Sequence, residues 1–144
     1  MRVIVQRVEK AHVTINKEIV GSIGQGYLLY IGIHVNDTPE MVQKMAEKIH
    51  LLRIFEDEQG KMNLNVSAVQ GSILAISQFT LYGNTKGNNR PSFIEAQRPE
   101  LAEPLYESLC KTLSIHHHVE KGVFGADMKV HAINDGPVTI LIEF

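Results

Sequence analysis

The feature that most constrains this fold is a segment with apolar side chains on both faces of the chain. Residues 27–35 read Tyr-Leu-Leu-Tyr-Ile-Gly-Ile-His-Val, without the alternation that one solvated face would impose. If the segment is a β-strand, both of its faces must be covered, which is typical of the centre of a sheet. The run is far too short to cross a bilayer as a helix. We therefore expect a central strand with a packed layer on each side.

Half-buried strands are expected around this segment. Residues 1–6 alternate in the period-2 pattern of a strand, and Val13 and Ile15 continue the pattern after a break near Lys10. The dipeptide Asn16-Lys17 is predicted to form the tip of a hairpin. Further strands are predicted at residues 19–23, 53–55, 72–81, 119–123, 128–134 and 138–144.

Two amphipathic segments are predicted to be helices. Residues 38–40, Thr-Pro-Glu, are typical of a helix start, and apolar residues at helical spacing continue to Leu52. The second helix runs to residue 113. Because Pro104 is tolerated only in a first turn, this helix either starts near Leu101 or kinks at the proline. These elements predict an α+β fold for a single domain spanning residues 1–144, with a mostly antiparallel curled or β-barrel-like sheet and two or three helices packed outside.

Charge and cysteine content exclude several classes of protein. The 144 residues carry a formal net charge of −2, so the chain lacks the basic field of a protein that coats nucleic acid nonspecifically. The single cysteine, Cys110, excludes an internal disulfide and a cysteine-based zinc site, and we expect it to be a small buried residue. Arg2 and Arg7 interrupt what would be the apolar stretch of a signal peptide. We expect a cytoplasmic protein with no membrane partner.

Two polar segments that adjoin apolar strands are the candidate functional sites. In the first, Ser77-Gln78-Phe79-Thr80-Leu81, either the strand simply leaves the core or its hydroxyls and free N–H groups hold an oxyanion or a nucleophile. No G-x-S-x-G is present, so a serine hydrolase is not favoured. In the second, Asn134-Asp135-Gly136-Pro137-Val138-Thr139, an ordinary turn competes with a cis Gly-Pro bond. Two carbonyls brought together by a cis bond would accept hydrogen bonds from an ammonium group.

Histidines and loop cations offer weaker candidates. Residues 116–118 are consecutive histidines, but neighbours on an extended chain point to opposite faces, so the three cannot converge on one metal ion. A solvated segment is expected there, and the remaining histidines form no recognisable pair. Lys86, Arg90 and Arg98 form the basic cluster of the loops, which is either a solvated surface or a contact to a phosphate backbone.

The two polar segments together match a known pattern. Ser77–Leu81 and Asn134-x-Gly136-Pro137-x-Thr139 resemble the paired signature motifs of the D-aminoacyl-tRNA deacylases, first described as D-tyrosyl-tRNA deacylases. The resemblance covers the whole chain, and no position of either motif departs from the pattern. Further similar segments are residues 1–8, 86–93 and 124–128.

This resemblance implies a function. The family hydrolyses the ester that joins a D-amino acid to the 3′ end of tRNA, and it excludes L-amino acids by geometry, while glycine can still enter. Its members are homodimers with two active sites at the subunit interface, where the first motif of one subunit would face Gly136-Pro137, in cis, of the other. Neither a metal nor a cofactor is implied. The implied catalytic residues are Ser77, Gln78, Phe79 and Thr80, the substrate-binding residues are Asn134, Gly136, Pro137 and Thr139, and the tRNA-binding residues are Lys86 and Arg90.

Two groups compete for the chemical step. Backbone N–H groups near Gln78 and Phe79 are expected to stabilise the oxyanion, at about 3 kcal/mol for one donor. Thr80 is a candidate nucleophile in the family, and the alternative assigns proton transfer to the 2′-hydroxyl of the terminal ribose. We favour the 2′-hydroxyl, because residues 77–81 include no histidine or carboxylate to activate Thr80. Two other hypotheses are a non-catalytic module that binds the tRNA 3′ end and a metal-dependent hydrolase that uses residues 116–118.

Overall fold

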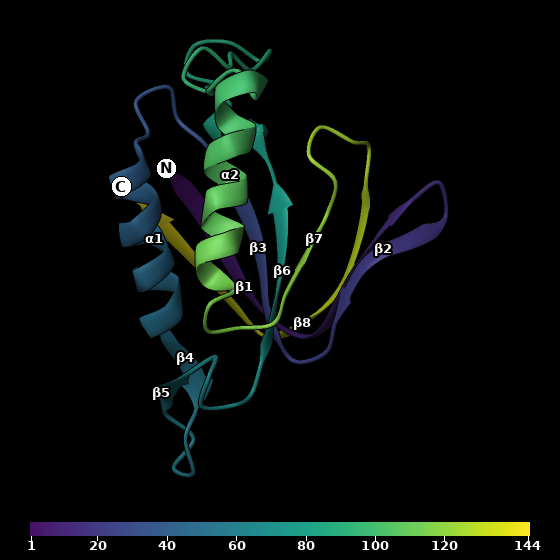
Figure 1. Ribbon diagram of the computed structural model, residues 1–144, viewed down its shortest axis with the longest axis vertical. Coiled ribbons are helices and arrows are strands. Elements are labelled where there is room, and N and C mark those ends of the chain that lie inside the picture. The colour runs from purple at the N-terminus through teal and green to yellow at the C-terminus, as the bar shows by residue number, and fades with distance from the viewer.

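A curled six-stranded sheet forms the centre of the computed structural model, which describes residues 1–144 (Figure 1). Strand β8 pairs with β1 outside the linear order of the other strands. That order is β2 (Glu18–Ile23), β1 (Arg2–Ile15), β3 (Gly26–Gly32), β6 (Ser72–Ser77) and β7 (Val119–Lys121), with β8 spanning Lys129–Glu143. A separate two-stranded ribbon consists of β4 (Arg53–Glu56) and β5 (Met62–Asn65).

Strand β1 organises the sheet. One of its edges pairs with β8 from Arg2 to Thr14. The other edge pairs with β3 as far as Val8 and with β2 beyond it. The strand continues through Lys10, but its alternation of buried and exposed residues is interrupted at Glu9 and Lys10, where its register with β8 also shifts. The hairpin tip at residues 16–17 is confirmed, with positive φ angles of 50° and 69°. The sheet curls into a nearly closed barrel, as predicted.

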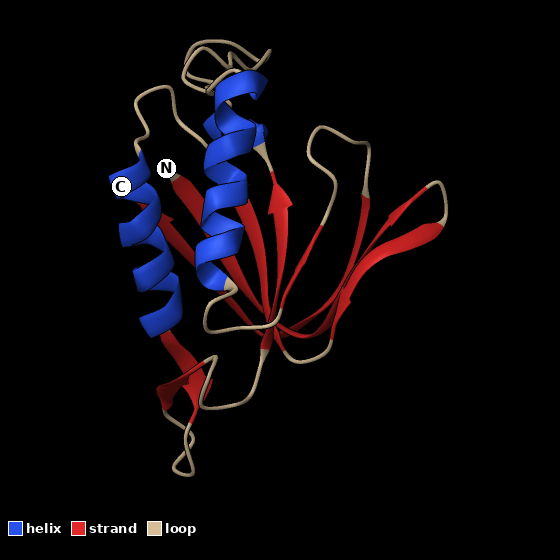
Figure 2. Cartoon of the chain, in the orientation of Figure 1, coloured by secondary structure: helices blue, strands red, loops and turns tan.

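Two helices cover one face of the sheet (Figure 2). Strand β3 runs parallel to β6, and β6 runs parallel to β7. Each parallel pair needs a crossover, and helices α1 (Pro39–Leu51) and α2 (Pro99–Leu113) provide them. The sheet is therefore mixed, with all pairings of β1 antiparallel. The predicted α+β class is confirmed.

The core lies on both faces of β3, as the apolar run predicts. One cluster packs Leu29 and Ile31 of β3 against Met45 of α1 and Leu109 of α2. The other cluster lies on the opposite face and includes Leu28. The strand ends at Gly32, three residues before the end of the apolar run. Cys110 is buried among the larger cluster as predicted, and its burial raises the pKa of the thiol to about 11.

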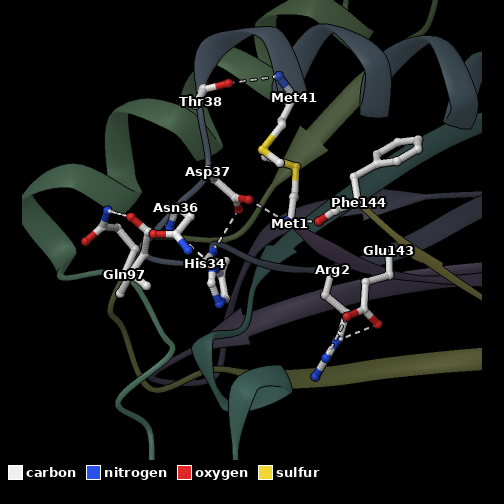
Figure 3. Close-up of polar contacts among 11 residues, drawn as sticks. Met1, Arg2, His34, Asn36, Asp37, Thr38, Met41, Gln97, Glu143 and Phe144 are labelled. Atoms are coloured by element: carbon white, nitrogen blue, oxygen red, sulfur yellow. Dashed lines mark hydrogen bonds and ion pairs between the residues drawn. The ribbon is translucent and has the colours of Figure 1, made fainter.

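The helix termini follow their sequence signals with one exception. Thr38 caps α1, since its hydroxyl accepts a hydrogen bond from the Met41 N–H at 3.4 Å (Figure 3). Helix α2 begins at Pro99, two residues before the predicted start, so Pro104 lies in the second turn. Proline removes the hydrogen bond to the carbonyl four residues back, here that of Glu100. Both residues are exposed, so water can bind that carbonyl.

Both candidate motifs depart from their predicted local structure. Strand β6 ends at Ser77, and Phe79–Tyr82 forms a 3-10 helix, η1, so the predicted strand to residue 81 is wrong. Residues 134–139 are not a turn between two strands, because β8 runs through them without interruption. The register between β1 and β8 shifts on both sides of Val8, which accommodates the irregular segment. None of the helices has both the length and the apolar character needed to cross a membrane.

Candidate active site

A cavity of about 590 Å³ lies at the carboxyl ends of the parallel strands β3 and β6. Ligands of sheets with parallel strands commonly bind at this end. Ile31 and Ile76 contribute the apolar floor. The wall opposite η1 comes from the start of α2 and from residues 124–130, which precede and begin β8. Three residues of the first motif, Ser77, Gln78 and Phe79, line the cavity as well.

The first motif is anchored at the point where β6 stops pairing. The Gln78 N–H donates to the Ile31 carbonyl at 2.7 Å, which extends the pairing of β3 and β6 by one bond. This N–H is therefore engaged, and the expectation that it would stabilise an oxyanion is wrong. The N–H groups of Phe79 and Thr80 follow at the start of η1 and have no partner in the chain, as is usual in the first turn of a helix. Phe79 is the remaining predicted donor.

The side chain of Thr80 is exposed and contacts no base. Its hydroxyl oxygen accepts a hydrogen bond from the Gln78 side-chain amide at 2.5 Å. An amide donor withdraws electron density from the oxygen and cannot remove its proton, whereas a nucleophilic hydroxyl needs an adjacent base. Thr80 is not among the residues that line the cavity. This arrangement does not activate Thr80 as a nucleophile.

Two exposed aromatic rings stand at the mouth of the cavity. Phe79 is 57% exposed and Phe93 is 37% exposed, and both line the cavity. Their centroids are 5.1 Å apart in an edge-to-face arrangement. Exposed aromatic rings are the usual platforms on which unpaired bases stack. The mouth is thus suited to a ligand with a flat ring and an attached polar group.

The second motif lies on β8 and is supported by a buried arginine. The Arg7 side chain is 5% exposed, and its Nε lies 3.0 Å from Oδ2 of Asp135. Its Nη1 donates to the Ile54 carbonyl at 2.7 Å. Gly136 has a φ of 115°, and a Cβ there would lie 2.8 Å from Val138 Cγ2 and 3.2 Å from Arg7 Nη2, so only glycine fits. The peptide bond between Gly136 and Pro137 is cis.

The two motifs are not brought together within one chain. Gly136 and Pro137 are exposed, as are Asn134 and Thr139, and none of the four lines the cavity. Thr139 donates from its hydroxyl to the Gln6 side-chain oxygen at 2.9 Å. Position along β1 gives the separation of the two motifs. The turn η1 lies beside Arg2, and the second motif lies beside Arg7, five residues further along the strand. Five residues of β-strand span about 17 Å. The second motif therefore faces solvent on a different part of the sheet.

The predicted basic cluster is divided by the structure. Lys86 and Arg90 are exposed in the loop between η1 and α2, which is closed by an isolated bridge between Asn84 and Ser92. Arg98, at the start of α2, lines the cavity, whereas the two loop cations do not. The loop adjoins Phe93 and thus the mouth of the cavity. Only Arg98 is placed to meet a ligand inside it.

The histidines form pairs that the sequence did not predict. His117 is 8% exposed, so the prediction of a solvated segment is wrong at this position. Its Nε2 lies 2.9 Å from His50 Nδ1, and burial lowers the pKa of His117. His12 and His131 stack with centroids 4.4 Å apart. No group of three or more His, Cys, Asp or Glu side chains is arranged to hold a metal ion.

Sequence reasoning missed the roles of Arg7 and Arg2, and it assigned Arg98 to the loop cluster and not to the cavity. Arg7 supports the second motif, Arg98 lines the cavity, and Arg2 contacts η1. For Arg7 a signal existed, because it occupies the buried phase of the alternation that begins at Met1. A charge on the buried phase of a strand needs partners, and those partners mark an ordered polar site. No local pattern distinguishes Arg2 from an ordinary surface residue.

Comparison with known proteins gives a consistent result. The profile of the D-Tyr-tRNA(Tyr) deacylase family matches residues 4–143. A D-aminoacyl-tRNA deacylase from Halalkalibacterium halodurans is 56% identical over 144 residues, covering 99% of this chain and 99% of its own length. Another from Porphyromonas gingivalis is 51% identical over 145 residues, covering 99% of this chain and 97% of its own.

Two solved structures have the same fold. That of a c-Myc DNA unwinding element binding protein superposes with a TM-score of 0.94 at 41% identity, covering 100% of this chain and 99% of that one. That of a probable eukaryotic D-amino acid tRNA deacylase gives a TM-score of 0.86 at 18% identity, covering 98% of this chain and 97% of that one. At that identity the likeness concerns the fold alone.

Proposed function

The chain belongs to the D-Tyr-tRNA(Tyr) deacylase family, and on that premise we propose that it hydrolyses the ester between a D-amino acid and the 3′ end of tRNA. One observation carries the proposal. The signature residues Ser77–Phe79 line a cavity with a stacking mouth, and the N–H of Phe79 beside it has no partner. The products are free tRNA and a D-amino acid. Such an enzyme acts in the cytoplasm, where its substrate is made.

The chemical demand on this site is modest. An ester has a better leaving group than an amide, so the main requirement is to stabilise the negative oxygen of the tetrahedral intermediate. The N–H of Phe79 supplies one donor, for which about 3 kcal/mol is a typical contribution. We assign proton transfer to the 2′-hydroxyl of the terminal ribose. The reason is that Thr80 accepts a hydrogen bond from an amide and contacts no base.

A second copy of the chain completes the site in this proposal. Gly136 and Pro137 are exposed and lie about 17 Å along the sheet from η1, so one chain cannot bring both motifs to one ligand. The outer edge of β8 is unpaired, and it presents Ile133 and Leu141, which are 45% and 57% exposed. An unpaired edge with apolar side chains favours association. In the homodimer each cavity receives Gly136-Pro137 from the other subunit.

Substrate selection follows from that arrangement. The carbonyls of Gly136 and Pro137 accept hydrogen bonds from the α-ammonium group of the amino acid. With the ester carbon and the ammonium both fixed, the side chain of a D-amino acid points outward, and that of an L-amino acid meets the wall. Glycine has no side chain and can enter. Because these contacts are made to the backbone of the amino acid, they discriminate poorly between different side chains.

Contacts with tRNA come from the mouth of the cavity. Phe79 and Phe93 offer stacking surfaces for the terminal base. Lys86 and Arg90 are exposed in the adjacent loop and reach phosphates of the acceptor end. With a net charge of −2 over the chain, this local pair supplies the attraction that the overall charge does not.

Deacylation of matched D- and L-tyrosyl-tRNA tests the proposal. With protein at one hundredth of the substrate concentration, the D-ester should be hydrolysed completely and the L-ester at its uncatalysed rate. Equal rates for the two enantiomers would overturn the assignment. Binding of D-tyrosyl-tRNA with no hydrolysis above the uncatalysed rate would favour a non-catalytic binding module. Loss of activity with a chelator would favour the metal-dependent alternative.

A further inference from the structure

Arg2 connects the turn that carries the first motif to the strand that carries the second. Its Nη1 donates to the Leu81 carbonyl in η1 at 2.5 Å. Its Nε and Nη2 donate to the two carboxylate oxygens of Glu143, at the end of β8, at 3.2 Å and 2.9 Å (Figure 3). This is the forked geometry in which arginine binds a carboxylate at two points. All of its named contacts hold other segments of the protein.

The turn η1 packs against the backbone of Gly32, which has no side chain and lies beside Arg2. Arg2 is the register partner of Gly32 on β3. A Cβ at Gly32 would lie 3.1 Å from Leu81 Cβ and 3.2 Å from the Gln78 carbonyl oxygen. The guanidinium carbon of Arg2 also lies 4.6 Å from the centroid of the Tyr82 ring, a cation–π contact with the last residue of η1. Gly32 and Arg2 thus form the surface against which η1 packs.

Apart from the buried Tyr82 ring, which packs against His34, the turn has few contacts that fix its backbone. A 3-10 helix of four residues has weak internal hydrogen bonds, and its terminal carbonyls need partners elsewhere. At its start, the Gln78 N–H is bound to Ile31. At its end, Arg2 binds the Leu81 carbonyl. Between these two bonds lie the N–H groups of Phe79 and Thr80, whose direction depends on both ends.

We propose that Arg2 is a positioning residue for deacylation: through the Leu81 carbonyl it fixes the direction of the N–H groups at the start of η1, while Glu143 orients its guanidinium. The inference deepens the proposed function and rests on it. Arg2 acts through the backbone of η1, so a change at Arg2 alters the stabilisation of the transition state more than the binding of tRNA. The charge of Arg2 is paired with Glu143.

Three variants and a control test this role. Arg2→Gln removes the positive charge and the two-point contact with Glu143. Arg2→Lys keeps the charge on a single donor nitrogen. Glu143→Gln leaves the guanidinium without its carboxylate. Arg53→Gln is the control, because Arg53 is an exposed arginine that contacts Asn63 on the separate ribbon. The kcat and KM for D-tyrosyl-tRNA are measured separately, together with thermal unfolding and amide hydrogen exchange of residues 81–83 in the free protein.

We expect Arg2→Gln to lower kcat roughly tenfold, the size of effect expected when a charge-assisted hydrogen bond is lost, with KM within about twofold. Arg2→Lys should recover part of kcat, and Glu143→Gln should lie between the wild type and Arg2→Gln. Exchange at residues 81–83, whose N–H groups are hydrogen-bonded within the turn, should accelerate in Arg2→Gln and not in Arg53→Gln. If Arg2→Gln does not fold, Glu143→Gln still tests the role through the same two measurements.

Several outcomes overturn the inference. Unchanged kcat in an active protein, or a rise in KM alone, would show that Arg2 does not act through η1. So would equal losses in Arg2→Gln and Arg53→Gln, or faster exchange with full activity. An inactive wild-type protein would instead overturn the proposed function, which separates the two failures.

Discussion

The guanidinium of Arg7 and the carboxylate of Asp135 form an ion pair of 3.0 Å in which the arginine is buried and the aspartate is 46% exposed. The pair stands immediately before Gly136-Pro137 on β8. A buried guanidinium is retained only where its donors are satisfied, and Arg7 also binds the Ile54 carbonyl. Arg7 therefore supports the irregular segment of β8 that includes the exposed Gly136-Pro137.

Replacing Arg7 should weaken both stability and activity. Arg7→Met keeps most of the apolar stem but leaves the Ile54 carbonyl without its donor, at a cost of about 1–3 kcal/mol. Because Asp135 is half exposed, loss of the ion pair adds little. Urea denaturation measures the first effect, and kcat/KM for D-tyrosyl-tRNA should fall as Gly136-Pro137 loses its support. Arg53→Met is the matched control. Full activity in Arg7→Met would show that β8 holds the motif unaided.

Asp37 should contribute more to stability than any surface carboxylate. The α-ammonium group of Met1 is fully buried and pairs with Asp37, whose side chain is 1% exposed and also accepts a hydrogen bond from the His34 N–H at 2.7 Å (Figure 3). Asp37→Asn leaves a buried cation without its counter-charge, which typically costs about 3–5 kcal/mol. Chemical denaturation measures this loss. Asp127→Asn, in an exposed pair with Lys129, should change little, and an equal effect of the two variants would contradict the prediction.

The predictable part of this fold is the part governed by local periodicity. The apolar run at 27–35 required cover on both faces, and β3 has it. Thr38 and the following proline marked the start of α1. What the sequence could not show is the pairing of β3 with β6, because a parallel pair forms between strands that are far apart in the chain. No local sequence pattern in β3 indicates that β6 is its partner.

The two motifs of the candidate site could be identified from their sequence pattern, but their secondary structure was predicted wrongly. Gly136-Pro137 has the composition of a turn, yet β1 supplies pairing on both sides of it, and the strand continues. The residues 79–81 have the composition of a strand, yet they form η1. That turn is possible because Gly32 leaves room for it on β3. In both cases a tertiary contact overrides the local preference, and such contacts cannot be read from one segment.

A methyl group at Gly32 should disturb the site with little effect elsewhere. In Gly32→Ala the new Cβ would lie 3.1 Å from Leu81 Cβ and 3.2 Å from the Gln78 carbonyl oxygen, so η1 must shift. We expect a fall in kcat for D-tyrosyl-tRNA of about tenfold or more, from the displaced donor at Phe79. Gly24→Ala is the control, since a Cβ there meets nothing within 4 Å. Equal activity of the two variants would show that η1 tolerates displacement.

Stability should depend on pH through His117. Burial, followed by the charges of His50 and His116, lowers the pKa of His117 below its ordinary value of 6.5. The unfolded chain then binds a proton at a higher pH than the folded chain does, so the free energy of unfolding falls as pH drops below about 6.5. Urea denaturation between pH 7.5 and 5.5 should show this loss. It should be smaller in His117→Gln than in the wild type. Identical curves for wild type and His117→Gln would contradict the prediction.

The last prediction concerns the group that performs the chemistry. If Thr80 is the nucleophile, Thr80→Ala removes the attacking atom, and kcat should fall by several orders of magnitude. If the N–H of Phe79 and the ribose 2′-hydroxyl do the work, the loss should be about tenfold or less, because the only contact removed is the one with the Gln78 amide. We expect the second result. The companion substrate is tRNA ending in 2′-deoxyadenosine and charged on the 3′-oxygen, which wild-type protein should bind but hydrolyse very slowly. An inactive Thr80→Ala variant, together with near-normal hydrolysis of the deoxy substrate, would assign the nucleophile to Thr80.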